Sequence, residues 1–274
     1  MKYRRILTIQ DISCAGQCSM TVALPVLSAC GQETCILPSA LLSTHTGGFG
    51  KPVVRHLVDT MAETVAHWKQ NNIRFDAILV GYLGSLEAIA RINEILDTML
   101  EPDGKVIIDP AMADHGKLYS GLDETYAKAM EGLCRRADVV LPNITEACMM
   151  TGMPYGDYSD QEAVRELLEN LNIPNVLLTG VSLTERDTGF ALYSSGRTSF
   201  YAHPRVDRSY HGTGDLFAAA FTGAWMFGKP MLRAAEIAAE FTRKSIENTY
   251  NNPAHWYGVK FETAIPYLID LLYK

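Results

Sequence analysis

The stretch from Ala77 to Pro110, AILV-GYLGS-LEAIARINEILDTML-EPDGK-VIIDP, contains two short apolar runs with a longer segment between them. The runs Ala77–Val80 and Val106–Ile108 are typical of buried strands, because each is brief, uninterrupted and followed by a glycine or an aspartate. Leu86 to Leu100 is predicted to be a helix that ends before Pro102-Asp103-Gly104. The order strand, helix, strand indicates parallel strands in a sheet covered by helices.

The same alternation extends in both directions along the chain. Further strands are predicted over Ile6–Ile9, Thr34–Leu37, Val139–Leu141 and Val176–Leu178, and helices over Ser19–Ala29, Val53–Asn71, Asp123–Cys134 and Gln161–Leu171. The runs Phe190–Tyr193 and Ser199–Ala202 flank Ser195-Gly196, which predicts an antiparallel hairpin at a sheet edge. Three helices, Asp215–Met226, Leu232–Thr249 and Glu262–Leu272, end the chain. We therefore expect one α/β domain over residues 1–274 with a mostly parallel central sheet.

Composition limits the partners of this protein. The chain has 274 residues, 47% of them hydrophobic, with 24 Lys and Arg against 31 Asp and Glu, for a net charge of −7. An acidic surface argues against nucleic acid or an anionic membrane as the main partner, although a small anion can still be bound by local backbone donors. No run approaches the roughly 18 apolar residues of a membrane span. We expect a soluble, cytoplasmic protein.

The six cysteines at positions 14, 18, 30, 35, 134 and 148 raise the question of a metal site. Their spacing lacks the paired Cys-x-x-Cys arrangement of structural zinc sites. Free thiols, buried in a reducing compartment, are the expected alternative.

Polar residues follow directly after several of the predicted strands. In parallel sheets, ligands bind beyond the carboxyl ends of the strands, so these residues predict a site, although loops are polar in any protein. They are Asp11, Gly81-Tyr82, Asp109-Pro110, Asn143 and Thr179-Gly180.

The segment His211-Gly212-Thr213-Gly214-Asp215 precedes a helix that is apolar on all sides. Two glycines allow a tight turn, and the amides of the first helical turn can then bind a phosphate or a developing oxyanion. Asp215 could accept a proton from an attacking hydroxyl. The alternative is an ordinary helix start in which Thr213 or Asp215 is the cap.

Taken together, these segments resemble the kinases of B6 vitamers in the ribokinase-like superfamily. The Gly212–Asp215 motif resembles the superfamily, and more specific likenesses lie in Leu42-Ser43-Thr44-His45-Thr46-Gly47, Gly81-Tyr82-Leu83-Gly84-Ser85, Asp109-Pro110-Ala111-Met112 and Pro142-Asn143-Ile144-Thr145-Glu146. The resemblance covers about Ile6 to Tyr250. It implies a three-layer α/β/α sandwich, a homodimer, and ATP-dependent phosphorylation of the 5′-hydroxymethyl group of pyridoxal, pyridoxine or pyridoxamine.

The resemblance also implies a role for each matching residue. Asp215 would be the catalytic base, with the amides of Gly212, Thr213 and Gly214 stabilising the transferred phosphoryl group. The vitamer would contact Asp11, His45, Thr46 and Tyr82. The nucleotide would contact Asn143, Glu146, Thr179, Thr213 and Gly214, with Asp109 and Glu146 near Mg²⁺, and a requirement for K⁺ stays open. From the residues alone, Asp109 could instead be a turn residue and Glu146 a first-turn helix carboxylate.

Two departures from the family pattern bear on specificity. Asp11 stands where these kinases usually have Ser, and we expect its carboxylate to reach the ring nitrogen or the 3-hydroxyl. The segment Asp114–Tyr119, in the place of the family's mobile lid, has no cysteine, which argues against a hemithioacetal with pyridoxal. Two other functions stay open: a hydroxymethylpyrimidine kinase of thiamine synthesis, and a non-catalytic protein that binds a B6 vitamer.

Overall fold

The computed structural model describes residues 3–274, which form two compact units. Unit 1 comprises the chain up to Lys105 together with Val206–Lys274, and unit 2 comprises Val106–Arg205. The chain passes from one to the other within strand β5 (Leu100–Ile108). The prediction of a single domain over the whole chain stays a prediction.

Unit 1 contains a mostly parallel sheet with the strand order β4-β1-β2-β3. Strand β1 (Arg5–Ser13) pairs in parallel with β2 (Glu33–Leu42) and with β4 (Phe75–Val80), and the short β3 (Val54–His56) runs antiparallel along the edge of β2. Because β1 lies between two strands and under helices, nearly all of its side chains are buried.

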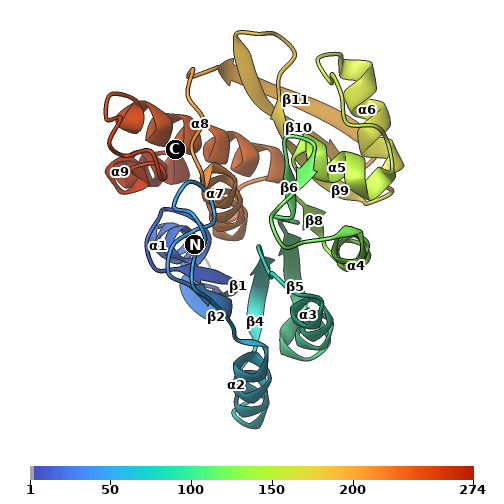
Figure 1. Cartoon of the computed structure of the whole chain (residues 1–274), viewed down its shortest axis with the longest axis vertical. Coiled ribbons are helices and arrows are strands. Elements are labelled where there is room, and N and C mark those ends of the chain that lie inside the picture. Colours follow the sequence, from blue (N-terminus) through green and yellow to red (C-terminus); the bar gives the residue numbers. More distant parts are fainter. Residues whose placement is uncertain (1–2) are drawn as a thin grey trace. The chain divides into compact units, whose positions relative to one another are not determined.

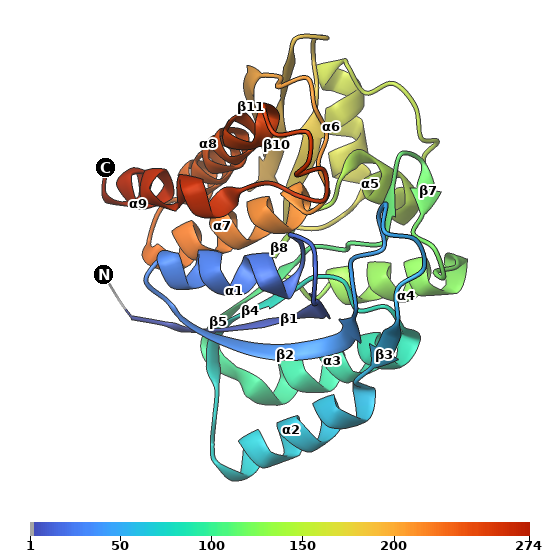
Figure 2. The ribbon, with the colours of Figure 1, turned by 60° about the vertical axis from the view of Figure 1, so that its left-hand side comes forward.

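Helices cover both faces of this sheet. Figure 2 shows α1 (Met20–Ala29) and α7 (Thr213–Phe227) on one face of β1 and β2, with α2 (Val58–Gln70) and α3 (Leu86–Met99) on the other. In Figure 1 the late helix α7 lies beside the early helix α1. The remaining helices of unit 1 are α8 (Met231–Tyr250), the 3₁₀ turn η1 (Phe261–Ala264) and α9 (Ile265–Tyr273).

Helix α7 is the buried centre of unit 1, as its uniformly apolar sequence predicts. Ten of its residues are buried, including Leu216, Phe221 and Ala224. A Cβ added to Gly223 would lie 2.5 Å from the Cys30 sulfur, so α7 and α1 approach each other closely at this glycine. This tight packing fixes the N-terminus of α7, where the Gly-Thr-Gly-Asp motif lies.

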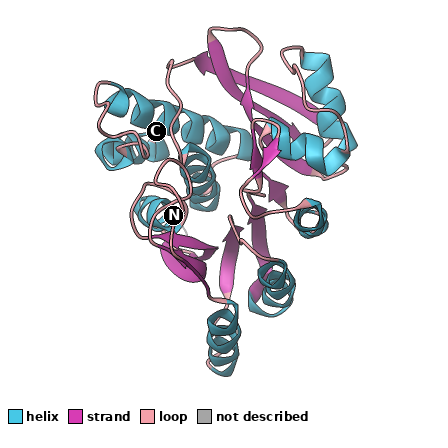
Figure 3. Cartoon of the chain, viewed as in Figure 1, coloured by secondary structure: helices cyan, strands magenta, loops and turns pink. Residues whose placement is uncertain are grey.

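Unit 2 has parallel strands followed by an antiparallel hairpin, in the order β11-β10-β9-β8-β5. Figure 3 shows the long hairpin of β10 and β11. The strands that follow β5 are β6 (Ala113–Asp114), β7 (Lys117–Leu118), β8 (Val139–Val140), β9 (Asn175–Val181), β10 (Asp187–Ser194) and β11 (Arg197–Pro204), and the helices are α4 (Glu124–Cys134), α5 (Ile144–Thr151) and α6 (Gln161–Asn170).

The fold predicted from the sequence is confirmed, with local corrections at the bounds of some elements. The helix expected over Val53–Asn71 is wrong at its start, because Val54–His56 forms the edge strand β3 before α2 begins at Val58. The β-branched valines after Pro52 fit this extended conformation. Helix α5 directly follows Asn143, as in the alternative that made Glu146 a first-turn helix carboxylate.

The cysteines and the helices of the described part of the chain bear on two further predictions. All six cysteines are free, and Cys18, Cys30, Cys134 and Cys148 are buried, as expected for thiols within the protein core. Among residues 3–274, no helix combines the length and the apolar character needed to cross a membrane.

Candidate active site

The N-terminus of α7 has the geometry of an anion site. Its first residue follows Gly212, which has a left-handed backbone with φ of 77°, and no side chain caps the helix. The Thr213 hydroxyl donates instead to the carbonyl of Tyr210 at 3.2 Å. The alternative in which Thr213 or Asp215 caps the helix is therefore wrong. The first-turn amides have no intrahelical acceptor and carry the positive end of the helix dipole.

The pairing of β1 with β2 is irregular at Asp11, where the extra residue lies on β2. The sequence predicted a strand ending at Ile9, but β1 continues to Ser13, and its register with β2 shifts between Gln10 and Ile12. Asp11 therefore lies within the strand at its carboxyl end, and its side chain is buried.

The Asp11 carboxylate is held by hydroxyl groups in a confined space. The Ser13 hydroxyl donates to it at 2.9 Å, and the Ser19 side chain also hydrogen-bonds to it. Ser19 is the N-cap residue of α1 with φ of 50°, a conformation rare for a serine, and its side chain does not cap the helix. Burial raises the pKa of Asp11, while both serine hydrogen bonds oppose the shift. The Asp11 carboxylate is thus held away from water.

Tyr82 and Asp215 lie near this carboxylate. Strands β1 and β4 are parallel neighbours, so Asp11 and Tyr82 both follow the paired segments Ile6–Ile9 and Ala77–Val80. Burial raises the pKa of the half-buried Tyr82, and the charge of Asp11 raises it further. The buried Cys18 thiol has a raised pKa because of burial, with added contributions from Asp215 and then Asp11. Unit 1 therefore brings together the predicted base and two predicted ring contacts.

The predicted ring-binding loop after β2 contains His45 and Thr46. Thr46 is exposed, whereas His45 is buried. The His45 Nε2–H donates to the carbonyl of Tyr257 at 3.0 Å, and its Nδ1 accepts from the backbone N–H of Gly47 at 3.1 Å. Both ring nitrogens thus have partners within the protein, which fixes a neutral tautomer. Burial, and then the nearby His211, lowers the pKa of His45.

In unit 2, the half-buried Asp109 and the buried Glu146 form a pair of carboxylates. Asp109 follows β5 directly, and its side chain accepts from the backbone of Ala111 at 3.1 Å. Burial raises the pKa of both groups, and the charge of Glu146 raises that of Asp109 further. Two like charges in a confined site favour a proton or a cation between or beside them.

Glu146 also has a clear structural function. One of its oxygens accepts from the backbone of Met112 at 2.9 Å and of Ala113 at 3.4 Å, and the other accepts from the backbone of Asn143 at 2.9 Å. The Asn143 side chain in turn caps α5 by accepting from the Glu146 backbone, which completes a capping box. The Asn-x-x-Glu spacing is the sequence signal that could have predicted this helix start.

Asn143 and Thr179 lie next to each other, although Thr179 and Gly180 are inside β9, which continues to Val181, and not in the loop that the sequence predicted. They form an isolated parallel bridge, and the Asn143 side chain also donates to the carbonyl of Ala113 at 2.8 Å. The expected lid segment Asp114–Tyr119 forms the small β6–β7 hairpin, whose turn residues His115 and Gly116 both have positive φ. In the described residues 3–274, no group of three or more His, Cys, Asp or Glu side chains gathers as a ready metal site.

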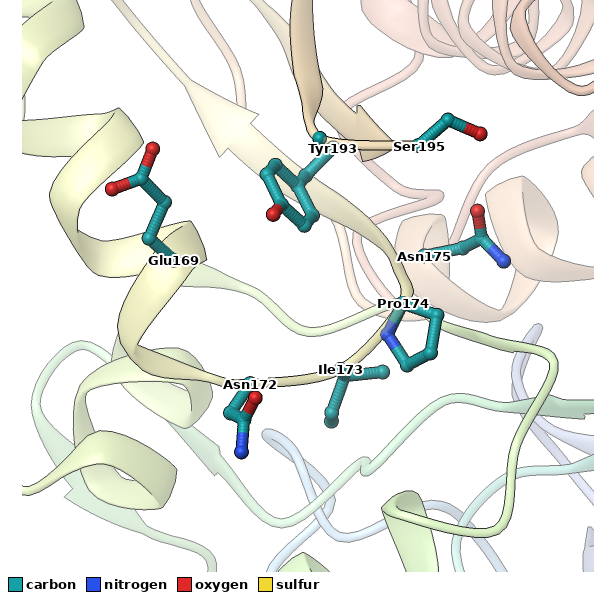
Figure 4. A pocket seen from close by; sticks show the side chains of 8 residues that line it. Glu169, Asn172, Ile173, Pro174, Asn175, Tyr193 and Ser195 are labelled. Atoms are coloured by element: carbon teal, nitrogen blue, oxygen red, sulfur yellow. The ribbon is translucent and has the colours of Figure 1, made fainter.

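A cavity of about 440 Å³ in unit 2 contains none of the predicted site residues. It lies at the start of β9 and at the turn of the β10–β11 hairpin, and Figure 4 shows Glu169, Asn172 and Tyr193 around it. Because ligand sites of parallel sheets lie beyond the carboxyl ends of strands, and this cavity is at the opposite end of β9, it is a poor candidate for the active site.

Comparison with known proteins shows the family of this chain. Residues 28–259 match the model of a family described as phosphomethylpyrimidine kinase. The chain belongs to the phosphomethylpyrimidine kinase family. Membership of this family of kinases shows that the protein is a kinase.

Relatives of the family carry two kinds of name. The chain is 30% identical over 198 residues to a hydroxymethylpyrimidine/phosphomethylpyrimidine kinase of Bacillus subtilis, a match that covers 72% of this chain and 69% of that one. A crystal structure of pyridoxal kinase from Lactobacillus plantarum has 31% identity, a TM-score of 0.90 and 98% coverage of both chains. The resemblance to B6 vitamer kinases seen in the sequence is thereby confirmed.

A third relative has the pyrimidine kinase name and a structure with pyridoxal. A putative phosphomethylpyrimidine kinase of Bacteroides thetaiotaomicron, crystallised with pyridoxal, is 33% identical, with a TM-score of 0.92 and coverage of 97% of this chain and 96% of that one. All three relatives are named as kinases, and the heterocycle in the name differs among them.

Proposed function

We propose that this protein catalyses the ATP-dependent phosphorylation of the 5′-hydroxymethyl group of a B6 vitamer. The observation that carries the proposal is the buried Asp11 carboxylate beside Tyr82, in a chain 33% identical to a relative that was crystallised with pyridoxal. A flat heterocycle is recognised by an aromatic wall and a few directed polar groups. Tyr82 would supply the wall, and Asp11 would accept a hydrogen bond from the protonated ring nitrogen or the 3-hydroxyl.

In this mechanism, unit 1 carries the groups that act on the acceptor hydroxyl. Asp215, in the first turn of α7, would accept the proton of the 5′-hydroxyl as its oxygen attacks the γ-phosphorus. The amides of Gly212, Thr213 and Gly214 would stabilise the charge that spreads over the transferred phosphoryl oxygens. Phosphoryl transfer depends mainly on such positioning and electrostatic stabilisation.

Unit 2 would contribute to nucleotide binding through Asn143, Thr179 and Glu146. The carboxylates of Asp109 and Glu146 are hard oxygen donors, which suits Mg²⁺, a cation that takes its other ligands from water and phosphate. Because both Glu146 oxygens already accept from backbone N–H groups, we assign Asp109 the closer approach and Glu146 the support of its loop. Bound Mg²⁺ would neutralise charge on the triphosphate.

Hydroxymethylpyrimidine phosphorylation is the second candidate, favoured by the matched family and by the Bacillus subtilis relative. The two are separated by measuring ATP consumption by the purified protein with pyridoxal and with hydroxymethylpyrimidine, each against an Asp215→Ala control. We expect the larger kcat/KM with pyridoxal and a loss of roughly 10²–10⁴-fold in the variant. Turnover of hydroxymethylpyrimidine alone would contradict the proposal. No turnover above the control with either substrate would favour a non-catalytic protein that binds the vitamer.

A further inference from the structure

The loop that follows α8, residues 251–258, packs against the loop that contains Thr46. The ring of Trp256 lies 4.6 Å from that of Phe49, centroid to centroid, and Tyr257 lies 5.9 Å from the same ring. Phe49 and Trp256 are 38% and 41% exposed. Large aromatic side chains held against each other at the surface, instead of in the core, indicate a contact that serves a local function.

The glycines between His45 and Phe49 leave no room for a methyl group. A Cβ at Gly48, which has φ of +80°, would lie 2.4 Å from the Trp256 ring. A Cβ at Gly47 would lie 2.4 Å from the His211 ring. The backbone that follows Thr46 therefore runs in van der Waals contact with two rings from distant parts of the chain.

His45 joins the same two loops by hydrogen bonds. It donates to the carbonyl of Tyr257 and accepts from the N–H of Gly47, so it links the loop 251–258 to its own loop. Its ring also lies 5.0 Å from Phe49 and 5.1 Å from His211. Both ring nitrogens of His45 thus form hydrogen bonds with backbone groups. Thr46, the next residue, is polar and exposed.

We propose that Trp256 and Tyr257 are positioning residues of the substrate site, which hold the Thr46 loop in the conformation that accepts a flat heterocycle. The inference rests on the proposed function above. A glycine-rich loop loses much conformational entropy when it becomes ordered, and a loop that is ordered beforehand spares the ligand that cost. Because the base and the phosphoryl-binding amides lie outside this loop, the contact should act on substrate binding and not on the chemical step.

The first test compares Trp256→Ala, Trp256→Phe and the control Tyr273→Ala in steady-state kinetics with pyridoxal. Tyr273 is an exposed aromatic residue of unit 1 whose ring packs on Phe227 instead. We expect Trp256→Ala to raise the KM for pyridoxal roughly tenfold or more, with kcat and the KM for ATP within about twofold of the parent. Trp256→Phe keeps a ring against Phe49 and should restore most of the affinity, and the control should match the parent protein.

A second measurement asks whether Gly48 and Trp256 act on the same loop. In Gly48→Ala the positive φ strains the alanine, and the new methyl group clashes with the Trp256 ring. In Gly48→Ala/Trp256→Ala the ring is absent and only the strain remains. The alanine at position 48 should therefore raise the KM for pyridoxal by a smaller factor in the double variant. Effects that multiply independently would overturn the proposed contact.

The outcomes separate this inference from the proposed function. A parent protein that turns over pyridoxal, with an unchanged KM in Trp256→Ala, overturns the inference and leaves the function standing. A parallel fall in kcat, ATP affinity and melting temperature would also overturn it, because it indicates a general role in folding. If the parent phosphorylates only hydroxymethylpyrimidine, the proposed function fails, and the same variants measured with that substrate decide the inference.

Discussion

Gly212 lies directly against the backbone of Gln17, so that a Cβ at position 212 would come within 1.9 Å of the Gln17 carbonyl oxygen. This contact joins the loop after β1 to the start of α7. Asp11 precedes this loop and Asp215 follows Gly212, so the contact brings the predicted ring-binding carboxylate and the predicted base into the same region of unit 1.

We expect Gly212→Ala to destabilise the protein strongly. The backbone at this position has φ of 77°, where an alanine is strained by about 1–2 kcal/mol, and the clash with Gln17 adds a further cost of about 1–3 kcal/mol. Urea denaturation should show a loss of at least about 2 kcal/mol. The matched control is Gly180→Ala, at which φ is 73° but no heavy atom lies within 4 Å of the new Cβ, so it reports strain alone. Equal losses in the two variants would contradict the close contact.

Gly214→Ala should lower the activity of the protein without lowering its stability. Gly214 lies in the first turn of α7, and a Cβ there would meet no heavy atom within 4 Å. Alanine in a helix is favoured over glycine by about 1 kcal/mol, so the free energy of unfolding should stay the same or rise. If a phosphoryl group occupies the space before these amides, the methyl group displaces it, and kcat/KM should fall roughly 10²-fold. A variant with full activity would show that this helix start does not bind the phosphoryl group.

The sequence was sufficient for the fold but only partly sufficient for the site. Short apolar runs between helices predicted the parallel strands, because that signal is local. The Gly-Thr-Gly-Asp motif predicted a helix start but left open whether Thr213 or Asp215 caps it. The edge strand Val54–His56 was missed, since three exposed residues next to a helix carry no hydrophobic period.

The contacts of His45 could not be predicted in the same way. Its partner Tyr257 lies 212 residues later in the chain, and the hydrogen bond to its carbonyl depends on tertiary packing that leaves no pattern in the sequence. The sequence therefore predicted His45 as a substrate contact. In the structure, both of its ring nitrogens form hydrogen bonds with backbone groups. Glu146 is the opposite case, because its Asn-x-x-Glu spacing was visible and would have predicted the capping box.

The three backbone hydrogen bonds of Glu146 predict a stability effect that is separate from any contact with a nucleotide. In Glu146→Gln the amide nitrogen replaces one accepting oxygen and faces a backbone N–H group, so at least one buried donor loses its acceptor. We expect a loss of about 1–3 kcal/mol in urea denaturation. Asn143→Ser, which keeps a capping side chain, is the milder comparison and should cost less. An unchanged midpoint for Glu146→Gln would show that the carboxylate does not hold the loop.

Asp11→Asn should make the protein more stable near neutral pH and less able to bind pyridoxal. Burial raises the pKa of Asp11 in the folded state, so its ionised form is destabilising there. Above the folded-state pKa this penalty is present in full; as the pH falls through that pKa toward the ordinary value of 3.8, protonation removes it. The stability advantage of the variant should therefore be largest at neutral pH and shrink in acid.

The measurement is urea denaturation of the parent and Asp11→Asn between neutral pH and about pH 4, together with the KM for pyridoxal at neutral pH. The exposed Asp270 of α9 provides a control, because Asp270→Asn removes one exposed carboxylate that is not among the predicted site residues. The KM should rise in Asp11→Asn, since a neutral amide no longer attracts a protonated ring, and should not change in the control. A stability difference that is constant with pH would show that Asp11 is not buried as a charge, and an unchanged KM would remove it from the ring site.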